Sequence, residues 1–274
     1  MSNTAAISNR PDHLPDFNCP PLNEVTLGVQ FAQPKGYQQI YAGEVWNLYR
    51  KDYPLVEEQA PLEPTFETFG LSAPSGQIKF VTGASHDRFW FLQTEGDELI
   101  QFQNDRLLHN WRKVGDRSNP YPRFEYMIAK YRNELEQLQT YMIGLASDAL
   151  AINQCEVSYI NHIIVENDDE LKASRWFRFI SFGDTEVDDF KAGFREIVRD
   201  EAGKPQGRLI GEAVSGRNQS GQRVFVFTLT VRGAPKEPKI ESALEFLSRG
   251  RELIVKRFAE LTSDYAHTKW ERCK

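Results

Sequence analysis

Two long segments carry the same helical stripe, and this repetition most constrains what the chain can fold into. From residue 124 and again from residue 240, the stripe recurs at spacings that alternate between 4 and 3 residues. Such alternation places its members on one face of an α-helix. The first stripe is Phe124, Ile128, Tyr131, Leu135, Leu138, Met142 and Leu145, and the second is Ile240, Leu244, Leu247, Arg251, Ile254, Phe258 and Leu261. Each position of the second lies 116 residues after its counterpart, and only Arg251 breaks the apolar run.

The remaining elements recur in a similar order. Alternating patterns predict strands at 24–31 and 156–165, each beginning with Glu-Val. Helices are predicted next, within 37–54 and over 168–180, followed by extended segments and then a long helix. The extended segments are 77–81, 89–92 and 99–102 in the first half, and 189–198, 207–215 and 222–231 in the second. The order predicts an α+β fold of two β-α-β-β-β-α pseudo-repeats, with a mainly antiparallel curved sheet and helices on one face.

This plan divides the chain into a flexible N-terminus over 1–16 and two repeats, 17–150 and 151–274, which could also form one continuous domain. Charged residues do not sort onto the positions beside the helical stripes, so we expect packing across the sheet rather than a coiled coil. The sheet face away from the helices would then be the functional face. Alternation places Gln101, Gln103, Thr228 and Thr230 on it.

Composition limits the classes of partner. The 274 residues carry 39 acidic and 33 basic side chains, a net charge of -6. Duplex binding normally needs an excess of cations, so the balance disfavours nucleic acid and suits a protein partner. Three cysteines far apart in the sequence indicate a reducing compartment. No signal peptide or membrane span is recognisable, which predicts a cytoplasmic protein.

Sequence motifs for catalysis are missing. The chain has no Gly-x-Ser-x-Gly, no phosphate-binding Gly-rich loop, and no pair of cysteines or histidines at metal-ligand spacing. Acidic pairs such as Asp188-Asp189 lack a third residue with a defined catalytic role. We therefore predict no catalytic residues, no metal site and no cofactor.

Residues 98–113, ELIQFQNDRLLHNWRK, begin as an alternating strand and then become rich in polar and aromatic groups. We interpret the second part as an irregular exit from the sheet that forms a recognition surface, because Trp and Arg are frequent interface anchors. The candidate binding residues are Asp105, Arg106, His109, Asn110, Trp111, Arg112 and Lys113, together with Tyr159 and Asn161. Two alternatives stay open. Basic groups around Trp111 could hold a single nucleic-acid strand, or Trp111 could pack over the long helix while Arg106 pairs with acids.

Three motifs in these regions resemble a sporadically distributed bacterial family of uncharacterised proteins, over roughly residues 20–265. They are Pro21, Leu22, Glu24 and Val25; Gln103, Asp105, Arg106, Asn110, Trp111 and Arg112; and Tyr159, Ile160 and Asn161. The resemblance implies no particular activity or cofactor. A patchy occurrence implies a mobile accessory or defence-associated gene.

The sequence as a whole predicts a non-catalytic protein-binding module, such as an antitoxin, immunity or defence-accessory protein. One alternative is a nucleic-acid-binding protein that uses the sheet face. Another is a small-molecule-binding protein or enzyme with a cavity under the sheet. Either a monomer or a homodimer is compatible with the sequence.

Overall fold

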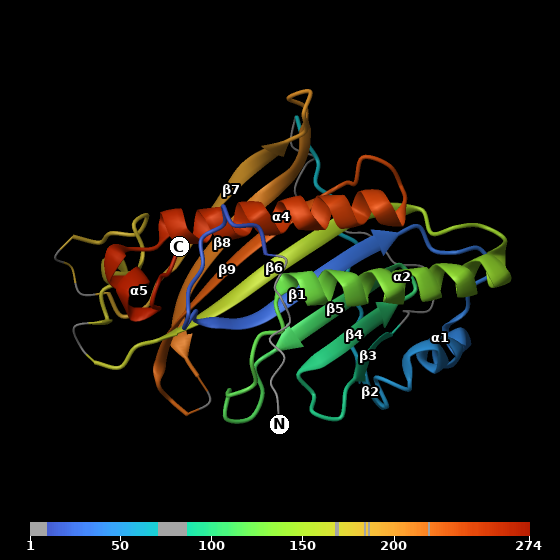
Figure 1. The fold of residues 1–274 in the computed structure, drawn as a ribbon, viewed down its shortest axis with the longest axis horizontal. Helices are drawn as coiled ribbons and strands as arrows, with labels where there is room; N and C mark the ends of the chain where they lie inside the picture. Colours follow the sequence, from blue (N-terminus) through green and yellow to red (C-terminus); the bar gives the residue numbers. More distant parts are fainter. Residues whose placement is uncertain (1–9, 71–86, 168–169, 184, 186, 219) are drawn as a thin grey trace.

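The computed structural model describes residues 10–70, 87–167, 170–183, 185, 187–218 and 220–274. Within them, nine strands form one open antiparallel sheet in the order β2-β3-β4-β5-β1-β6-β9-β8-β7 (Figure 1). The strands are β1 (Leu22–Phe31), β2 (Leu55–Gln59), β3 (Arg88–Leu92), β4 (Glu98–Gln103), β5 (Arg106–Arg112), β6 (Ile152–Ile164), β7 (Lys191–Arg199), β8 (Pro205–Arg217) and β9 (Arg223–Gly233). The α+β class with a mainly antiparallel sheet is therefore confirmed.

The first strands of the two halves meet in the middle of the sheet. β1 pairs with β5 on one side and with β6 on the other, and β6 in turn pairs with β9. The two halves therefore share one continuous sheet. The helical elements are η1 (Gln39–Tyr41), α1 (Ala42–Tyr49), α2 (Phe124–Ala146), α3 (Ala173–Trp176), α4 (Ile240–Leu261) and α5 (Asp264–Lys269).

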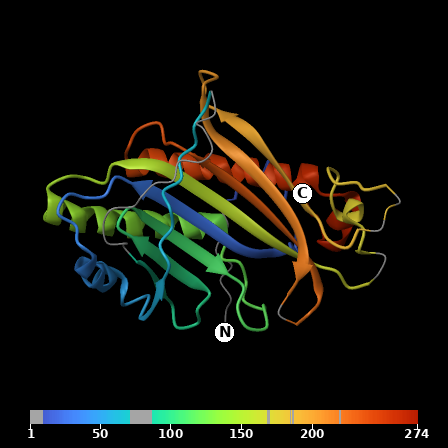
Figure 2. The same cartoon turned by 180° about the vertical axis from the view of Figure 1, so that it is seen from behind.

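The two long helices form as the stripes predict. α2 and α4 lie side by side in front of the sheet in Figure 1 and behind it in Figure 2. All seven stripe positions of α4 are buried, including the charged Arg251. Its guanidinium donates to the Glu125 carboxylate of α2 at 2.6 Å. The one polar position in the stripe thus joins the two helices.

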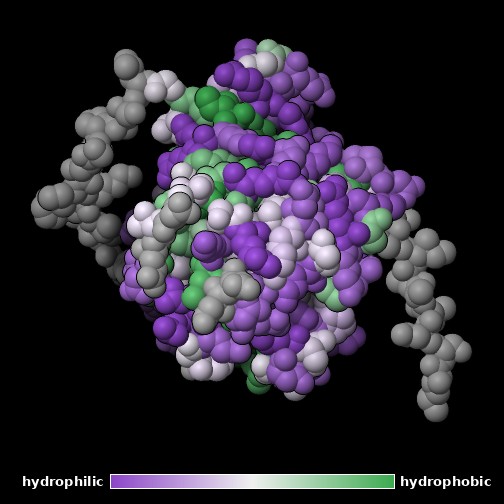
Figure 3. Space-filling view, turned by 90° about the vertical axis from the view of Figure 1, so that its left-hand side faces the viewer, coloured by the Kyte–Doolittle hydropathy of each residue, from purple (hydrophilic) through white to green (hydrophobic). Residues whose placement is uncertain are grey.

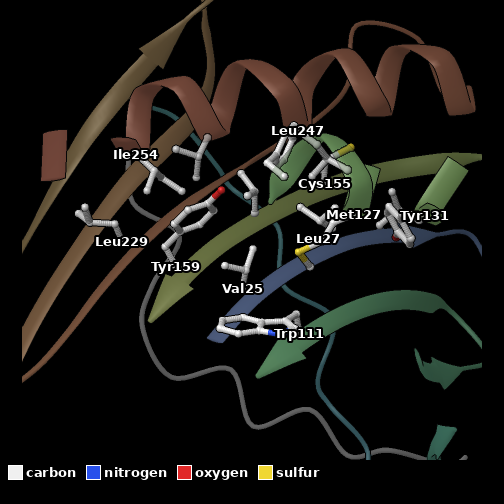
Figure 4. Close-up of a cluster of buried hydrophobic side chains, with 14 of the residues drawn as sticks. Val25, Leu27, Trp111, Met127, Tyr131, Cys155, Tyr159, Leu229, Leu247 and Ile254 are labelled. Carbon is white, nitrogen blue, oxygen red and sulfur yellow. The ribbon is translucent and has the colours of Figure 1, made fainter. Parts of the chain in front are cut away.

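The core lies between these helices and the sheet. Alternate strand residues such as Leu27, Val157 and Leu229 are fully buried there and meet side chains of α2 and α4 (Figure 4). α4 approaches the strands closely because residue 250 is glycine. A Cβ at Gly250 would lie 2.7 Å from Val157 Cγ1. Burying apolar surface in this layer is the main stabilising term.

Two local predictions are wrong. The helix expected over 168–180 is reduced to the single turn α3, and Phe177 then pairs with Thr262 in a β-bridge. Its aromatic side chains are better buried by an extended chain, because Phe177 reaches Phe227 with ring centroids 5.2 Å apart. The irregular exit expected after residue 103 is instead strand β5, which forms a hairpin with β4.

Residues 10–16 belong to the segment predicted to be flexible, yet Leu14 is buried and Asp16 accepts from Arg123 at 3.1 Å. Strand β2 was not predicted, and the predicted strand 77–81 lies outside the described residues. No helix in the described part of the chain combines the length and apolarity needed to cross a bilayer.

Candidate binding face of the sheet

The sheet face opposite α2 and α4, called the open face below, is rich in polar side chains. Strand alternation sends one set of residues toward the helices and the other set to this face. Thr26, Asn110, Ser158 and Thr230 are opposite one another on four adjacent strands. Gln101, Gln103 and Thr228 share the face, as the sequence predicts. These polar groups lie on the face away from α2 and α4, where side chains that bond peptide groups can hold another chain segment.

A segment of the chain itself already lies on the open face. Residues 60–70, called the crossing segment, follow β2 and pass in front of the strands in Figure 2 (cyan). Leu62 bonds to a residue of β4, and Glu67 bonds to residues of β8 and β9. Four strand spacings from β4 to β9 make about 19 Å. Five residues reach at most about 18 Å, so the crossing segment must be extended, and the side chains that make the contacts supply the rest of the span.

Glutamine side chains of the sheet hold the backbone of the crossing segment. The Gln103 carboxamide accepts from Leu62 N at 2.9 Å and donates to Leu62 O at 3.0 Å. The Gln30 carboxamide oxygen accepts from Thr65 N at 3.2 Å. Arg88 adds a bond to the carbonyl of Ala60 at 3.2 Å. These contacts address peptide groups rather than side chains, so they do not depend on the sequence of the bound segment.

One side chain of the crossing segment is held as firmly as its backbone. The Glu67 carboxylate pairs with Arg208 of β8 and lies 3.7 Å from Arg232 of β9, and its side chain is only 6% exposed. Arg208 also donates to the carbonyl of Thr68 at 2.7 Å and stacks over the Phe69 ring. A carboxylate between two guanidinium groups forms charge-assisted hydrogen bonds, which are stronger than neutral ones. The open face therefore contains a site for an anionic group.

A cavity of about 410 Å³ remains between the crossing segment and the sheet. Its lining includes Arg106, Gln30, Gln154 and Arg232 from the sheet and Thr65 from the crossing segment. The carboxamide oxygen of Gln154 is buried and accepts no hydrogen bond within the described structure. A buried acceptor without a donor costs free energy, so a ligand that supplies an N–H or O–H there would gain it.

Of the predicted binding residues, four lie on or beside the open face. Arg106 forms a bidentate pair with Asp105 at 2.9 and 3.0 Å and lines the cavity. Asn110 donates to Glu24 at 2.6 Å and to Thr26 at 2.7 Å, and it accepts from Gln101. Burial raises the pKa of Glu24, although this bond from Asn110 opposes the shift. Arg112 stacks on the Trp90 ring with 5.3 Å to the centroid.

The other predicted residues point toward the helices or sit at a strand end. Trp111 is 1% exposed and packs on Tyr121, with ring centroids 5.1 Å apart. Tyr159 is buried against the Tyr121 hydroxyl at 3.1 Å, and the Asn161 amide donates to the carbonyl of Phe227. Lys113 follows β5 and donates to the carbonyl of Asn119 at 2.6 Å. Buried in this way, Trp111 and Tyr159 fill the core.

His109 belongs to a buried polar cluster under α2. Its Nδ1 lies 3.0 Å from the carboxylate of Glu134, which also accepts from the Tyr53 hydroxyl at 2.6 Å. Burial and the neighbouring Glu134 carboxylate raise the pKa of Tyr53, so the phenol stays a donor. On the opposite side, His109 Nε2 lies 4.0 Å from Glu98, which pairs with Lys130. The cluster joins α2, the sheet and the connection after α1 that carries Tyr53, and it lies too deep to meet a partner.

Sequence reasoning missed the residues that hold the crossing segment. Gln30, Gln154, Glu67 and Arg208 belong to no motif, and residues 55–82 looked like a Pro- and Glu-rich connection. A usable signal was present in β1 and β6. Gln30 and Gln154 stand at polar positions of two alternating strands that are paired on both sides, where a buried carboxamide requires a hydrogen-bond partner.

No protein-family model and no curated protein matches the chain. The resemblance to a bacterial family therefore stays a prediction. Among the residues that the structure describes, no group of three His, Cys, Asp or Glu side chains could hold a metal ion.

Proposed function

We propose that this protein is a non-catalytic binding module whose open face holds an extended polypeptide segment of a partner protein. The observation that supports this proposal is the crossing segment, which lies there through backbone bonds to Gln103 and Gln30. Side chains that bond peptide N–H and C=O groups suit a polypeptide ligand. A role as an antitoxin, immunity or defence-accessory protein of a bacterial cytoplasm stays a prediction within this proposal.

The sheet supports a further part of the proposal, that the two halves are repeats. Reading outward from the centre, the first half runs β1, β5, β4, β3, β2 and the second runs β6, β9, β8, β7. The first strand of each half thus lies at the middle of the sheet, and the last strand of each half, β5 or β9, lies beside it. A duplicated α+β unit with its helices on one face would give this arrangement, and it would leave the open face as one broad surface.

Site-specific photo-crosslinking in the cells of origin tests the proposal. A benzophenone amino acid replaces Glu212 or Thr228, which pair with each other on the open face. The control position is the exposed Thr140 on α2. We expect one protein adduct from both open-face positions and none from Thr140. Adducts that are equal at all three positions, or absent from the open face, would contradict the proposal.

A single nucleic-acid strand is the second candidate, because Arg88, Arg106, Arg208 and Arg232 share the open face with Trp90. The arginines, however, already bond protein acceptors: Ala60 O, Asp105, Glu67 and Glu156, respectively. Three of the four thus pair with carboxylates, which reduces the positive charge available for phosphates. A salt titration with labelled single-stranded and duplex oligonucleotides decides between the two candidates, since negligible affinity at low salt eliminates the second.

A small molecule in the cavity under the crossing segment is the third candidate. Its volume of about 410 Å³ falls in the size range of ligand pockets. A ligand that binds the folded state raises the melting temperature. An unchanged melting temperature across a panel of metabolites and metal ions would remove this candidate.

A further inference from the structure

We infer that the crossing segment is an internal substitute for the partner, and that the partner binds as an extended acidic peptide whose carboxylate takes the place of Glu67 between Arg208 and Arg232. This inference rests on the proposed function and specifies the chemistry of the partner. The crossing segment must leave the open face for the partner to bind. The protein would therefore control its own affinity through the strength of the Glu67 contacts.

The charges around Glu67 favour an acidic occupant. Arg232 has a second acid, Glu156, whereas Glu67 is the only acid within ion-pair distance of Arg208 in the described structure. With the crossing segment in place the Arg208 side chain is only 22% exposed, and a partner that replaces this segment would cover Arg208 again. A partner carboxylate restores the pair, and a neutral partner leaves a cation unpaired at a cost.

The row of glutamines explains why the occupant should be an extended chain. Gln103, Arg106, Gln30 and Gln154 lie opposite one another on β4, β5, β1 and β6. The crossing segment uses the first and third of these side chains, and it leaves the Gln154 oxygen without a donor. The segment is therefore an incomplete ligand. A peptide with an N–H opposite Gln154 makes one more bond than the crossing segment does.

The contact surface is not a general apolar patch. The crossing segment meets the sheet through carboxamide, guanidinium and carboxylate groups, each within hydrogen-bond or ion-pair distance. Seen from the end that carries α5, the surface of the molecule is mostly hydrophilic, with apolar side chains in patches (Figure 3).

Fluorescence anisotropy with a labelled peptide of residues 60–70, APLEPTFETFG, tests the inference on the full-length protein. In the wild type the tethered segment competes at high effective concentration and keeps the peptide off. Glu67→Gln removes the charge of the internal segment and keeps its shape. We expect this variant to bind the peptide at least tenfold more tightly than the wild type does.

A matched control makes the same chemical change elsewhere. Glu260→Gln removes a carboxylate that pairs with Arg257 on the exposed side of α4, and it should bind the peptide like the wild type. Adding Arg208→Gln and Arg232→Gln to Glu67→Gln should abolish the increase in peptide affinity. A peptide with glutamine at the position of Glu67 should bind the Glu67→Gln protein at least tenfold more weakly than the original peptide. This peptide-side change leaves the protein untouched, so it holds even if the triple variant unfolds.

The possible outcomes separate this inference from the proposed function. Equal affinity for the acidic and amide peptides would overturn the inference, and the proposed binding of polypeptides would stand. The absence of peptide binding to every variant would also overturn it. The proposed function would then depend on the crosslinks from Glu212 and Thr228, which do not require this peptide.

Discussion

The two faces of the central sheet use the same strands and bury their side chains in opposite ways. Toward the helices, Leu27, Val157 and Val231 form an apolar row across β1, β6 and β9. On the open face, the neighbouring row contains Ser158 and Thr230, whose hydroxyls lie 2.7 Å apart. Both rows are buried. The helix face is stabilised by apolar area, and the open face by mutual satisfaction of polar groups.

This difference shows where a substitution acts. On the helix face a lost methyl group leaves a cavity, and the cost depends on volume. On the open face a lost polar group leaves its partner without a hydrogen bond, and the cost depends on that partner. The buried cluster at His109 is the exception on the helix face. There, too, the cost of a substitution depends on the hydrogen-bond partner that it leaves behind.

The largest effect is expected at this exception. Glu134→Ala removes the carboxylate that accepts from Tyr53 and His109, both of which are buried. Leaving two buried donors without their acceptor costs about 4 kcal/mol of unfolding free energy. Urea denaturation at pH 7 measures it. A loss below 1 kcal/mol, a threshold typical of exposed pairs, would show that water reaches the cluster.

Apolar substitutions compare the two faces directly. Leu138→Ala in α2 removes a fully buried side chain and should lower the unfolding free energy by about 3 kcal/mol. Val214 of β8 faces the open side and is 36% exposed, so Val214→Ala should cost under about 1 kcal/mol. Equal losses in urea denaturation would mean that the open face is as closed as the core.

The helix face was predictable because its signal is periodic and local. The apolar stripes predicted both α2 and α4. Arg251, the one charged residue in these stripes, contacts Glu125. The alternation in β1, β4 and β6 likewise predicted strands. Residues such as Trp111 were harder, because a strand in which both faces are buried loses the alternation of polarity. The polar segment after residue 103 therefore looked like an irregular exit.

The open face was predictable only in part. Alternation placed Gln101 and Gln103 on it. No local pattern could reveal that residues 60–70 lie across them, because that contact joins Gln30 of β1 to Thr65 and Arg208 of β8 to Glu67. Such long-range pairing of single side chains carries no periodicity. The helix 168–180 failed for a related reason, since Phe177 is recruited by the distant Phe227.

A moderate effect is expected for a polar group of the open face. Asn110→Ala leaves the Gln101 amide and Thr26 without their partner and should cost about 2 kcal/mol. Asn110→Asp should cost more, because it places a second carboxyl beside Glu24, now 2.6 Å from the Asn110 amide. Chemical denaturation of both variants measures the order. If Asn110→Ala loses more unfolding free energy than Asn110→Asp, packing rather than hydrogen bonding dominates the stability of the open face.

The smallest effect extends the comparison to the end of the helix layer, where His267 is buried. Its Nε2 lies 2.9 Å from Thr262 Oγ1 and its Nδ1 is 3.1 Å from an Arg272 nitrogen, so the neutral ring donates to one and accepts from the other. Burial first, and then the charge of Arg272, lower the pKa of His267. As the pH falls below the unfolded value of about 6.5, the unfolded chain takes up a proton that the folded chain resists. Stability should therefore be full above that pH and decline below it.

His267→Gln keeps a donor and an acceptor without the titration, so its melting temperature should fall less than that of the wild type between pH 7 and pH 5. His162 also has a pKa lowered by burial and by Arg117, so it contributes a decline of the same sign that His267→Gln leaves in place. The informative quantity is the difference between the two proteins, which isolates one buried ring. A difference that is zero or of opposite sign would mean that Arg272 moves away and lets His267 become charged inside the fold. This end of the helix layer would then be less rigid than the apolar core.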